Sequence, residues 1–161
     1  MTSKKIVWFA LGFAFTVIGS LIKIPAIVGS VGLDAFPSLV IASLFSVGMG
    51  GIVAGVGHLL SALLTGFPLG PFHLLIAFEM TFCVLIYGYL FQAGRKKLAA
   101  LMFWIGNAII SPIPFIFLLN WSFFIAMIPS LMIGAAINIA VALLFVRVFQ
   151  ERLSRVIKRG D

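Results

Sequence analysis

The sequence has little charge, few acids and a single cysteine. Of its 161 residues only 9% are charged and four are Asp or Glu, whereas 63% are apolar. An ordinary soluble domain has roughly a quarter charged residues. So few polar side chains cannot cover a surface that faces water, which excludes soluble enzymes and soluble nucleic-acid-binding proteins. Cys83 is the one cysteine, so no disulfide can form within the chain. The composition is that of an integral membrane protein.

Motifs of catalysis and of ATP hydrolysis are also missing. No lysine is followed by Ser or Thr, which excludes a Walker A loop, and neither HExxH nor GxSxG occurs. We therefore expect no catalytic residue and no cofactor. The two histidines lie on different predicted helices, so we expect no metal site. The net charge of +7 falls at predicted membrane exits and forms no patch with interleaved aromatics, so no nucleic-acid partner is expected.

Long uncharged stretches predict the membrane spans. Stretches of forty-four and forty-nine uncharged residues lie at 35–78 and 98–146, and each has room for two helices of about 20 residues. The glycine cluster at 48–51 and the segment 120–122 are the turns expected to divide them. The sequence thus predicts an all-α integral membrane protein, a six-transmembrane-helix bundle in a single membrane domain (1–161), with spans at about 6–22, 35–47, 50–66, 71–92, 98–119 and 122–147.

The basic residues predict the orientation of these spans. Ten of the eleven lie in three clusters, at 4–5, 95–97 and 147–159, and cytoplasmic loops are enriched in Lys and Arg. Four spans and then two spans separate the clusters, so both termini and the 95–97 loop are expected in the cytoplasm, with Lys23 as the exception outside. The run 6–22 has no small-residue cleavage site after it and is expected to be an uncleaved first span.

Polar residues inside the spans are the candidates for a binding site, because ionisable groups are costly in a bilayer. His58 leads a polar stripe with Ser61 and Thr65, at helical spacing; a ligand contact and an interhelical hydrogen bond are both open for it. Glu79 is the one acid within a span, where it can contact a ligand, pair with His58 or serve structure alone. Asn107 lies near the middle of the fifth span, before two prolines that either open a pocket in the outer half or only kink the helix.

The remaining candidates lie near the predicted outer surface or deeper in the last span. His73 and Phe72 begin the fourth span, and Phe72 shares a helix face with Glu79. Trp121 lies at the outer edge, where tryptophan also serves as an interfacial anchor. Asn138 is deeper, with bridging of helices as its alternative role. The first outer loop, 23–36, is long enough to fold over a cavity as a lid, or else rests on lipid headgroups.

Two features carry a resemblance to a known family. Ala10 and Ala14 form an AxxxA motif in the first predicted span, and a long outer loop follows it. More specific are the stretches IKIPAIVGSVGLDAFPSLV at 22–40 and GHLLSALLTGFPLGPFHLLIAFEM at 57–80. On these residues the chain resembles the substrate-binding S component of an energy-coupling factor (ECF) vitamin transporter. The two stretches are similar to the branch assigned to precursors of the cobalamin lower ligand, alpha-ribazole or dimethylbenzimidazole.

The resemblance implies a division of labour in a bacterial cell membrane. The multi-pass S component would capture a vitamin-like small molecule outside, with the first outer loop as its gate. A transmembrane coupling subunit and two ATP-binding-cassette ATPases would drive a toppling motion that delivers the substrate inward. Ala10 and Ala14 match the motif that packs against the coupling subunit. The family supplies no motif for the substrate contacts, which therefore rest on the residues above: Phe72 or Trp121 stacking on a benzimidazole, and Glu79, His58 or Asn107 bonding its nitrogen or ribose hydroxyls.

Other functions stay open at this point. One is an S component for another vitamin, such as riboflavin or a queuosine precursor. Another is an ion-coupled secondary carrier that uses Glu79 and His58 as a relay and needs no ATPase. A membrane enzyme or a structural helper subunit ranks last, because no pair of nucleophile and base is visible.

Overall fold

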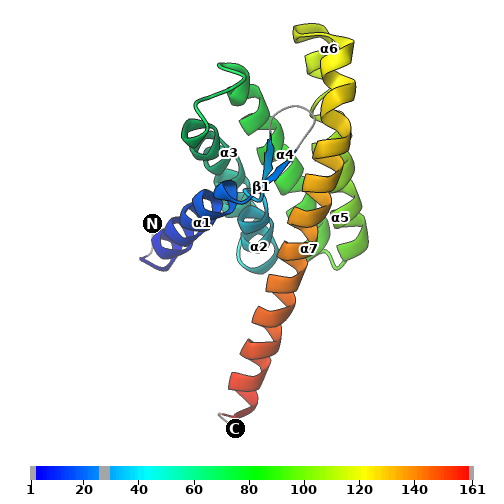
Figure 1. Cartoon of the computed structure of the whole chain (residues 1–161). Coiled ribbons are helices and arrows are strands. Elements are labelled where there is room, and N and C mark those ends of the chain that lie inside the picture. The colour runs from blue at the N-terminus through cyan, green and yellow to red at the C-terminus, as the bar shows by residue number, and fades with distance from the viewer. Residues whose placement is uncertain (1–2, 26–29, 160–161) are drawn as a thin grey trace.

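The protein is a bundle of helices with one small β-hairpin (Figure 1). The computed structural model describes residues 3–25 and 30–159. In chain order the elements are α1 (Ser3–Leu21), β1 (Lys23–Pro25), β2 (Ser30–Gly32), α2 (Phe36–Leu44), α3 (Val47–Leu64), α4 (Phe72–Gln92), α5 (Lys96–Ile105), the π-helix η1 (Gly106–Ile110), α6 (Pro114–Leu118) and α7 (Trp121–Arg159). The predicted class, a helical membrane bundle, is confirmed at this level.

Four helical segments in the described part of the chain are long and apolar enough to cross a membrane: α3, α4, the run from α5 to α6 (Lys96–Leu118) and the first part of α7 (Trp121–Arg152). A shorter apolar helix, Lys5–Leu21, comes from α1. The nine residues of α2 extend for only about 14 Å at 1.5 Å per residue, against a hydrocarbon core of about 30 Å. The span predicted at 35–47 is therefore a half-length helix.

The break between α2 and α3 lies before the glycine cluster and not within it. Ser46 has an extended backbone, and its Oγ accepts a hydrogen bond from the Met49 N–H (3.4 Å), so it caps α3. The turn predicted at 48–51 is wrong, because these residues form the first turns of α3. A Cβ at Gly50 would come within 2.5 Å of the Ala42 Cβ on α2. Glycine here allows two helices to pack closely.

Small residues also join α1 to α3. A Cβ added at Gly57 of α3 would lie 2.8 Å from the Thr16 Cγ2 atom, and both Thr16 and Gly12 of α1 are buried. Ala10 lies two residues before Gly12, and Ala14 lies two residues before Thr16. Two residues correspond to a rotation of about 200° around a helix. Both alanines are exposed. The helix α1 therefore has one small-residue face in the bundle and a second one on the outside.

The core lies between α2, α4, α5 and α7. Its fully buried side chains include Leu39, Val84, Tyr87 and Phe103. The Tyr87 hydroxyl and the Ser43 Oγ are 3.0 Å apart, so this buried hydroxyl keeps a hydrogen-bond partner. On the far side of each helix large apolar side chains are exposed, as expected where lipid replaces water.

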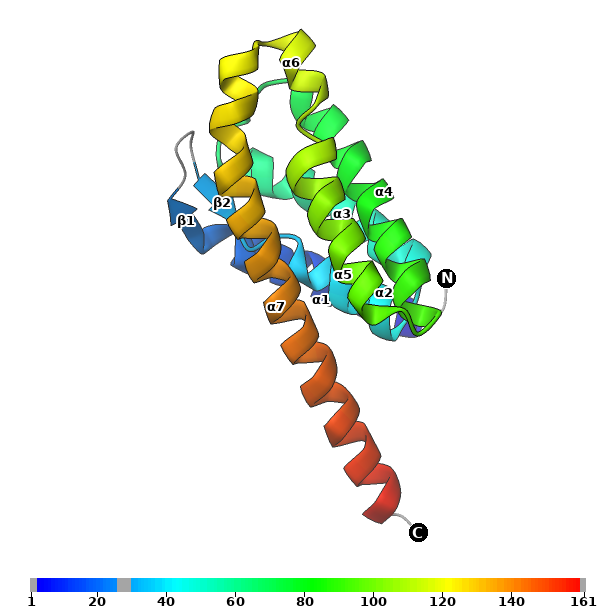
Figure 2. The same cartoon turned by 90° about the vertical axis from the view of Figure 1, so that its right-hand side faces the viewer.

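The two ends of the bundle differ. One end, here called the hairpin end, holds the α3–α4 connection (65–71) and α6, and the β1–β2 hairpin lies on the same side, nearer the middle of the molecule (Figures 1 and 2). The start of α1, the α4–α5 connection (93–95) and the end of α7 lie toward the opposite end.

The strands β1 and β2 both lie within the predicted first outer loop, 23–36. They pair antiparallel, with Lys23 opposite Gly32, and the Leu33 N–H donates to the Gly19 carbonyl at 3.0 Å. The predicted loop therefore turns back on the end of α1; its residues 26–29 lie outside the described part.

Candidate functional site

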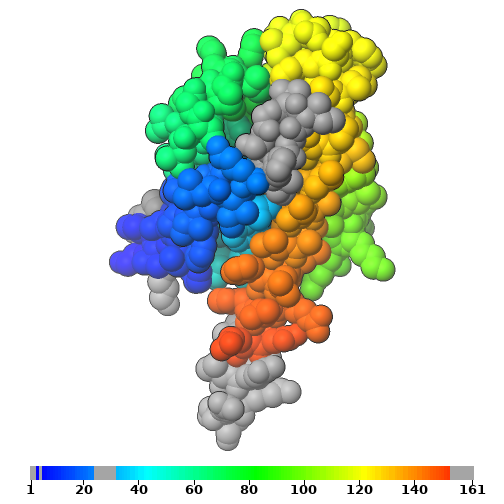
Figure 3. Space-filling model, viewed as in Figure 1, coloured from blue at the N-terminus to red at the C-terminus, as the bar shows by residue number. Residues whose placement is uncertain are grey.

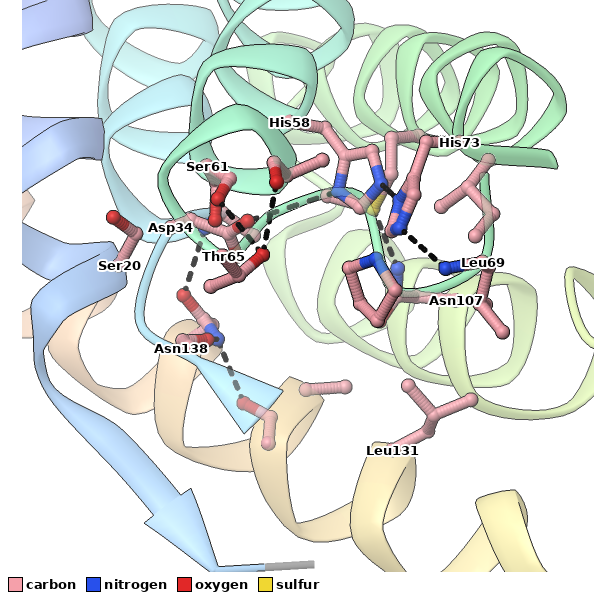
Figure 4. A pocket seen from close by; sticks show the side chains of 18 of the residues that line it. Ser20, Asp34, His58, Ser61, Thr65, Leu69, His73, Asn107, Leu131 and Asn138 are labelled. Atoms are coloured by element: carbon pink, nitrogen blue, oxygen red, sulfur yellow. Dashed lines mark hydrogen bonds and ion pairs between the residues drawn. The ribbon is translucent and has the colours of Figure 1, made fainter. Parts of the chain in front are cut away.

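A cavity of about 230 Å³ lies at the hairpin end, lined by residues of α1, β1, β2, α3, α4, η1, α7 and the α3–α4 connection. Ligand pockets of drug-sized molecules start at about 300 Å³, so this cavity suits a small ligand. Four of the residues predicted from the sequence line it: His58, His73, Asn107 and Asn138 (Figure 4). Apolar side chains, among them Met80 and Met127, form much of the rest of the wall.

The two histidines form a hydrogen-bonded chain whose direction is fixed by a backbone donor. The Leu69 N–H donates to His73 Nε2 at 3.3 Å, so this nitrogen carries no proton. The proton of the neutral His73 ring is then on Nδ1, which lies 3.1 Å from His58 Nε2 and donates to it. The neutral His58 ring consequently carries its proton on Nδ1. The α3–α4 connection thus determines the tautomers of both rings.

The free end of this chain faces Asp34, just after β2. His58 Nδ1 lies 3.7 Å from Asp34 Oδ2, an ion-pair distance beyond direct hydrogen bonding. Both side chains keep 16% of their surface exposed. Figure 4 shows Asp34, His58 and His73 in sequence along one wall. The cavity therefore offers a carboxylate and an N–H donor side by side.

Asn138 on α7 holds the backbone that follows the hairpin. Its Oδ1 accepts hydrogen bonds from the N–H groups of Ala35 (3.1 Å) and Phe36 (2.8 Å), the start of α2. Its Nδ2 donates to the carbonyls of Gly32 (3.2 Å) and Gly134 (2.9 Å). An asparagine side chain has two donors and two acceptor positions, and all are in use. Asn138 bridges elements, and it has no hydrogen bond left for a ligand.

Asn107 owes its position to the π-helix η1. The Ser111 N–H donates to the Gly106 carbonyl at 2.8 Å, five residues earlier, and Pro112 follows without an N–H to continue an α-helix. Single π turns inside helices are frequent at functional sites. Asn107 Nδ2 donates to Met80 Sδ, whereas its Oδ1 has no partner among the described residues. This amide oxygen is available to a ligand.

The other three predicted residues are placed elsewhere in the described structure. Phe72 packs edge-on against Phe115, with ring centroids 5.8 Å apart, and does not line the cavity. Trp121 is 60% exposed at the start of α7. Glu79 Oε2 is buried without a hydrogen-bond partner among the described residues, and Glu79 is not part of the cavity wall.

The predicted pairing of Glu79 with His58 is likewise not found among the described residues, because the acid beside His58 is Asp34. The ion-coupled carrier considered above would need the Glu79–His58 pair as its relay. The described residues also hold no group of three or more His, Cys, Asp or Glu side chains that could bind a metal ion.

Sequence reasoning allowed the 23–36 loop to cover a cavity as a lid, but it missed the side chains that this part of the chain supplies to the site. Asp34, Lys23 and Ser20 line the cavity, but a charge beside a predicted span ordinarily marks only the membrane boundary. The available signal was the length of the 23–36 loop, which exceeds what a connector needs and lets the chain return over the site. Met80 and Met127 carried no signal, because methionine is common on any apolar helix face.

The comparison with known families decides what kind of site this is. A model of the family described as ECF transporter, substrate-specific component, matches residues 4–157. The chain belongs to this family. Among the curated proteins, none matches it.

S components of ECF transporters are substrate-binding subunits of importers and not enzymes, and the family implies association with a membrane coupling subunit and ATPases. The cavity at the hairpin end is therefore the candidate substrate site of this S component, which is embedded in a membrane.

Proposed function

We propose that this S component binds alpha-ribazole, a precursor of the cobalamin lower ligand, and hands it to the ATP-driven importer. The observation that supports this proposal is that the residues which resemble the alpha-ribazole branch lie around the cavity. The stretches 22–40 and 57–80, which resemble the alpha-ribazole branch, supply most of the residues that line the cavity. A resemblance that is most specific in the stretches lining the cavity supports an assignment of the ligand more strongly than one spread evenly over the fold.

The chemistry of the cavity suits a benzimidazole carrying a sugar. Met80, Met127 and Phe123 line the wall from α4 and α7, and sulfur and aromatic edges both interact favourably with a flat ring. Asn107 on the same side has a free amide oxygen and an amide N–H for polar atoms of the ligand. The Asp34–His58 pair supplies a donor and an acceptor for hydroxyl groups at the other side.

We further propose that both termini are cytoplasmic and that the chain passes through a bacterial membrane in the six predicted segments, with the half-length α2 completing its pass through the chain that enters it from the hairpin. The exposed basic residues Lys5, Arg95, Lys97 and Arg147 lie on the segments found toward the end opposite the hairpin (Figures 1 and 2). Lys and Arg mark the cytoplasmic side. The hairpin and its cavity then face the outside, where a vitamin precursor is captured.

The coupling subunit is proposed to dock on the exposed face of α1. Ala10 and Ala14 are exposed there, and exposed small residues let a second helix approach closely in a membrane. Beside them an apolar groove of about 180 Å³ runs between α1, α2 and α7, lined by Trp8, Phe15 and Phe149 among others. Figure 3 shows α2 (cyan) at the floor between α1 (blue) and α7 (orange). Force applied to this face by the ATPase-driven partner would topple the S component.

Isothermal titration calorimetry on the purified protein in detergent tests the proposed substrate. We expect alpha-ribazole to bind with a dissociation constant below about 1 µM, equivalent to about −8 kcal/mol, and riboflavin to give no heat. Dimethylbenzimidazole, which lacks the sugar, should bind more weakly than alpha-ribazole. Binding of riboflavin or a queuosine precursor in place of alpha-ribazole would contradict the proposed substrate and leave the S component with another vitamin.

A further inference from the structure

We propose that Asp34 determines the specificity of this S component, by requiring hydroxyl groups on the ligand and rejecting a ligand that carries a phosphate at that end. This inference rests on the proposed function, since it takes the cavity at the hairpin end as the substrate site. The position of Asp34 beside a predicted membrane span does not by itself suggest this role. The inference also orients the bound ligand, with its hydroxyl groups at Asp34 and its ring toward Asn107.

Most polar side chains of the cavity have no hydrogen bond left to give. Asn138 uses all four of its hydrogen-bonding positions on the backbone. His73 is bonded at both ring nitrogens. Ser20 and Thr65 donate their hydroxyl protons to carbonyls of their own helices, at 2.7 Å and at 3.0 to 3.2 Å. A ligand therefore cannot be recognised through these donors without breaking existing bonds.

Apart from the Ser61 hydroxyl, one turn after His58 on α3, and the exposed Lys23, the polar groups that remain lie in two places. His58 Nδ1–H and the Asp34 carboxylate face each other at 3.7 Å, a separation that leaves both of them capacity to bond a third partner. Asn107, on η1, has a free oxygen and a second Nδ2–H, and this N–H can donate to an unprotonated ring nitrogen. A ligand that satisfies both places must carry hydrogen-bond donors for the carboxylate at one end and a polar ring atom for Asn107 at the other. Neighbouring hydroxyl groups meet the first requirement, because a hydroxyl can donate to Asp34 and accept from His58.

The position of Asp34 is fixed by its neighbours in the chain. The next two backbone N–H groups, of Ala35 and Phe36, are held by Asn138, and the preceding Leu33 N–H is held by the Gly19 carbonyl at 3.0 Å. The Asp34 backbone therefore cannot move far from the cavity without breaking several buried hydrogen bonds. The carboxylate moves only by rotation about its own side-chain bonds, which keeps this acceptor at the cavity.

The charge of the cavity wall also favours an uncharged ligand. Asp34 is the one acid that lines it among the described residues, and the one Lys or Arg there is Lys23, which is exposed. Two anionic groups at close range in a partly buried site repel each other strongly. A 5′-phosphate is carried by the same ribose as the hydroxyl groups that face Asp34, close enough for the two anions to repel each other, so the 5′-phosphate should bind at least about tenfold more weakly than the free nucleoside.

The experiment compares three ligands and three proteins by calorimetry in detergent. The ligands are alpha-ribazole, alpha-ribazole 5′-phosphate and dimethylbenzimidazole. The proteins are the unmodified chain, Asp34→Asn, which keeps the size of the side chain, and Glu151→Gln as a matched change of acid to amide on the exposed part of α7. We expect the unmodified chain to prefer alpha-ribazole over its phosphate by at least about tenfold.

In Asp34→Asn we expect alpha-ribazole to bind about tenfold to hundredfold more weakly, and the preference over the phosphate to shrink toward equality. Dimethylbenzimidazole, which has no hydroxyl, should bind all three proteins within about twofold of one another. An equal loss for dimethylbenzimidazole would show that Asp34 only supports the fold and would overturn the inference. So would tight binding of the phosphate by the unmodified chain, a comparison that needs no variant.

The experiment also distinguishes a wrong substrate assignment from a wrong role for Asp34. If alpha-ribazole does not bind, riboflavin and its 5′-phosphate provide the same comparison of a neutral hydroxylated ring with its anion. Binding of riboflavin alone, weakened by Asp34→Asn, would reject alpha-ribazole as substrate and support the role of Asp34. Binding of none of these ligands would reject both.

Discussion

Replacing Ala10 and Ala14 together by leucine is expected to separate ligand binding from transport. Both alanines are exposed on α1, about 200° away from the buried Gly12 and Thr16. Leucine at these positions enters no part of the bundle, but it fills the space that a packed partner helix would occupy. We expect uptake to fall by at least tenfold, to about the background level, with the coupling subunit lost on co-purification. The dissociation constant of the ligand should stay within about twofold.

The chain offers a matched control for this experiment. Ala136 and Ala140 on α7 are also exposed and four residues apart, on the side of α7 away from the buried Ala135 and Ile139. The double change of Ala136 and Ala140 to leucine adds the same volume at the membrane-facing surface and should leave both uptake and co-purification intact. Loss of ligand binding in the Ala10 and Ala14 variant would mean that α1 is part of the substrate site. An equal loss of transport in the control would contradict docking of the coupling subunit specifically on α1.

A single methyl group at Gly19 is expected to weaken ligand binding more than any other change of that size. A Cβ at this buried position would collide with the Leu33 backbone carbonyl and approach a Phe36 ring carbon at 3.2 Å. A backbone group cannot rotate away as a side chain does, so the segment after β2 must shift. That segment carries Asp34. We expect Gly19→Ala to raise the dissociation constant at least about tenfold, since overpacking costs about 1 to 3 kcal/mol.

Gly48→Ala is the control for this substitution. A Cβ at Gly48 meets nothing within 4 Å, and alanine in a helix is more favourable than glycine by about 0.5 to 1 kcal/mol. Binding should be unchanged and thermal stability equal or slightly higher. Calorimetry together with a melting curve measures both variants. A Gly19→Ala protein that binds like the unmodified chain would show that the hairpin shifts without moving the site.

The order and the approximate ends of the helices follow from the spacing of charges, because a bilayer requires long apolar segments. The α4 helix, for example, begins at Phe72 and ends at Gln92, beside the predicted 71–92. Glycine is a turn signal in water, and this signal predicts the α2–α3 break too late in the chain. Inside a membrane bundle glycine also marks close helix contacts, as Gly50 does. Ser46, three residues before Met49, was the better signal, since it has the side chain of a helix cap.

The candidate site could be predicted only in part for a related reason. Histidines in apolar helices are costly, so His58 and His73 stood out, and the structure brings them together. Glu79 met the same criterion, but helical periodicity gives a face of a helix and not the neighbour that covers it. Asp34 reaches the cavity through the return of the hairpin onto α1, a contact between distant parts of the chain that one sequence does not show.

The central claim is that this chain captures a substrate and that a separate coupling subunit with its ATPases drives transport. Uptake by reconstituted proteoliposomes tests this claim most directly. One set of vesicles holds the chain alone, and the other holds the chain with its coupling subunit and ATPases, each with labelled alpha-ribazole outside. We predict saturable binding without accumulation in the first set, and accumulation that requires ATP and resists protonophore in the second. Accumulation by the chain alone, driven by a proton gradient and abolished by protonophore, would contradict this and make the protein an ion-coupled carrier.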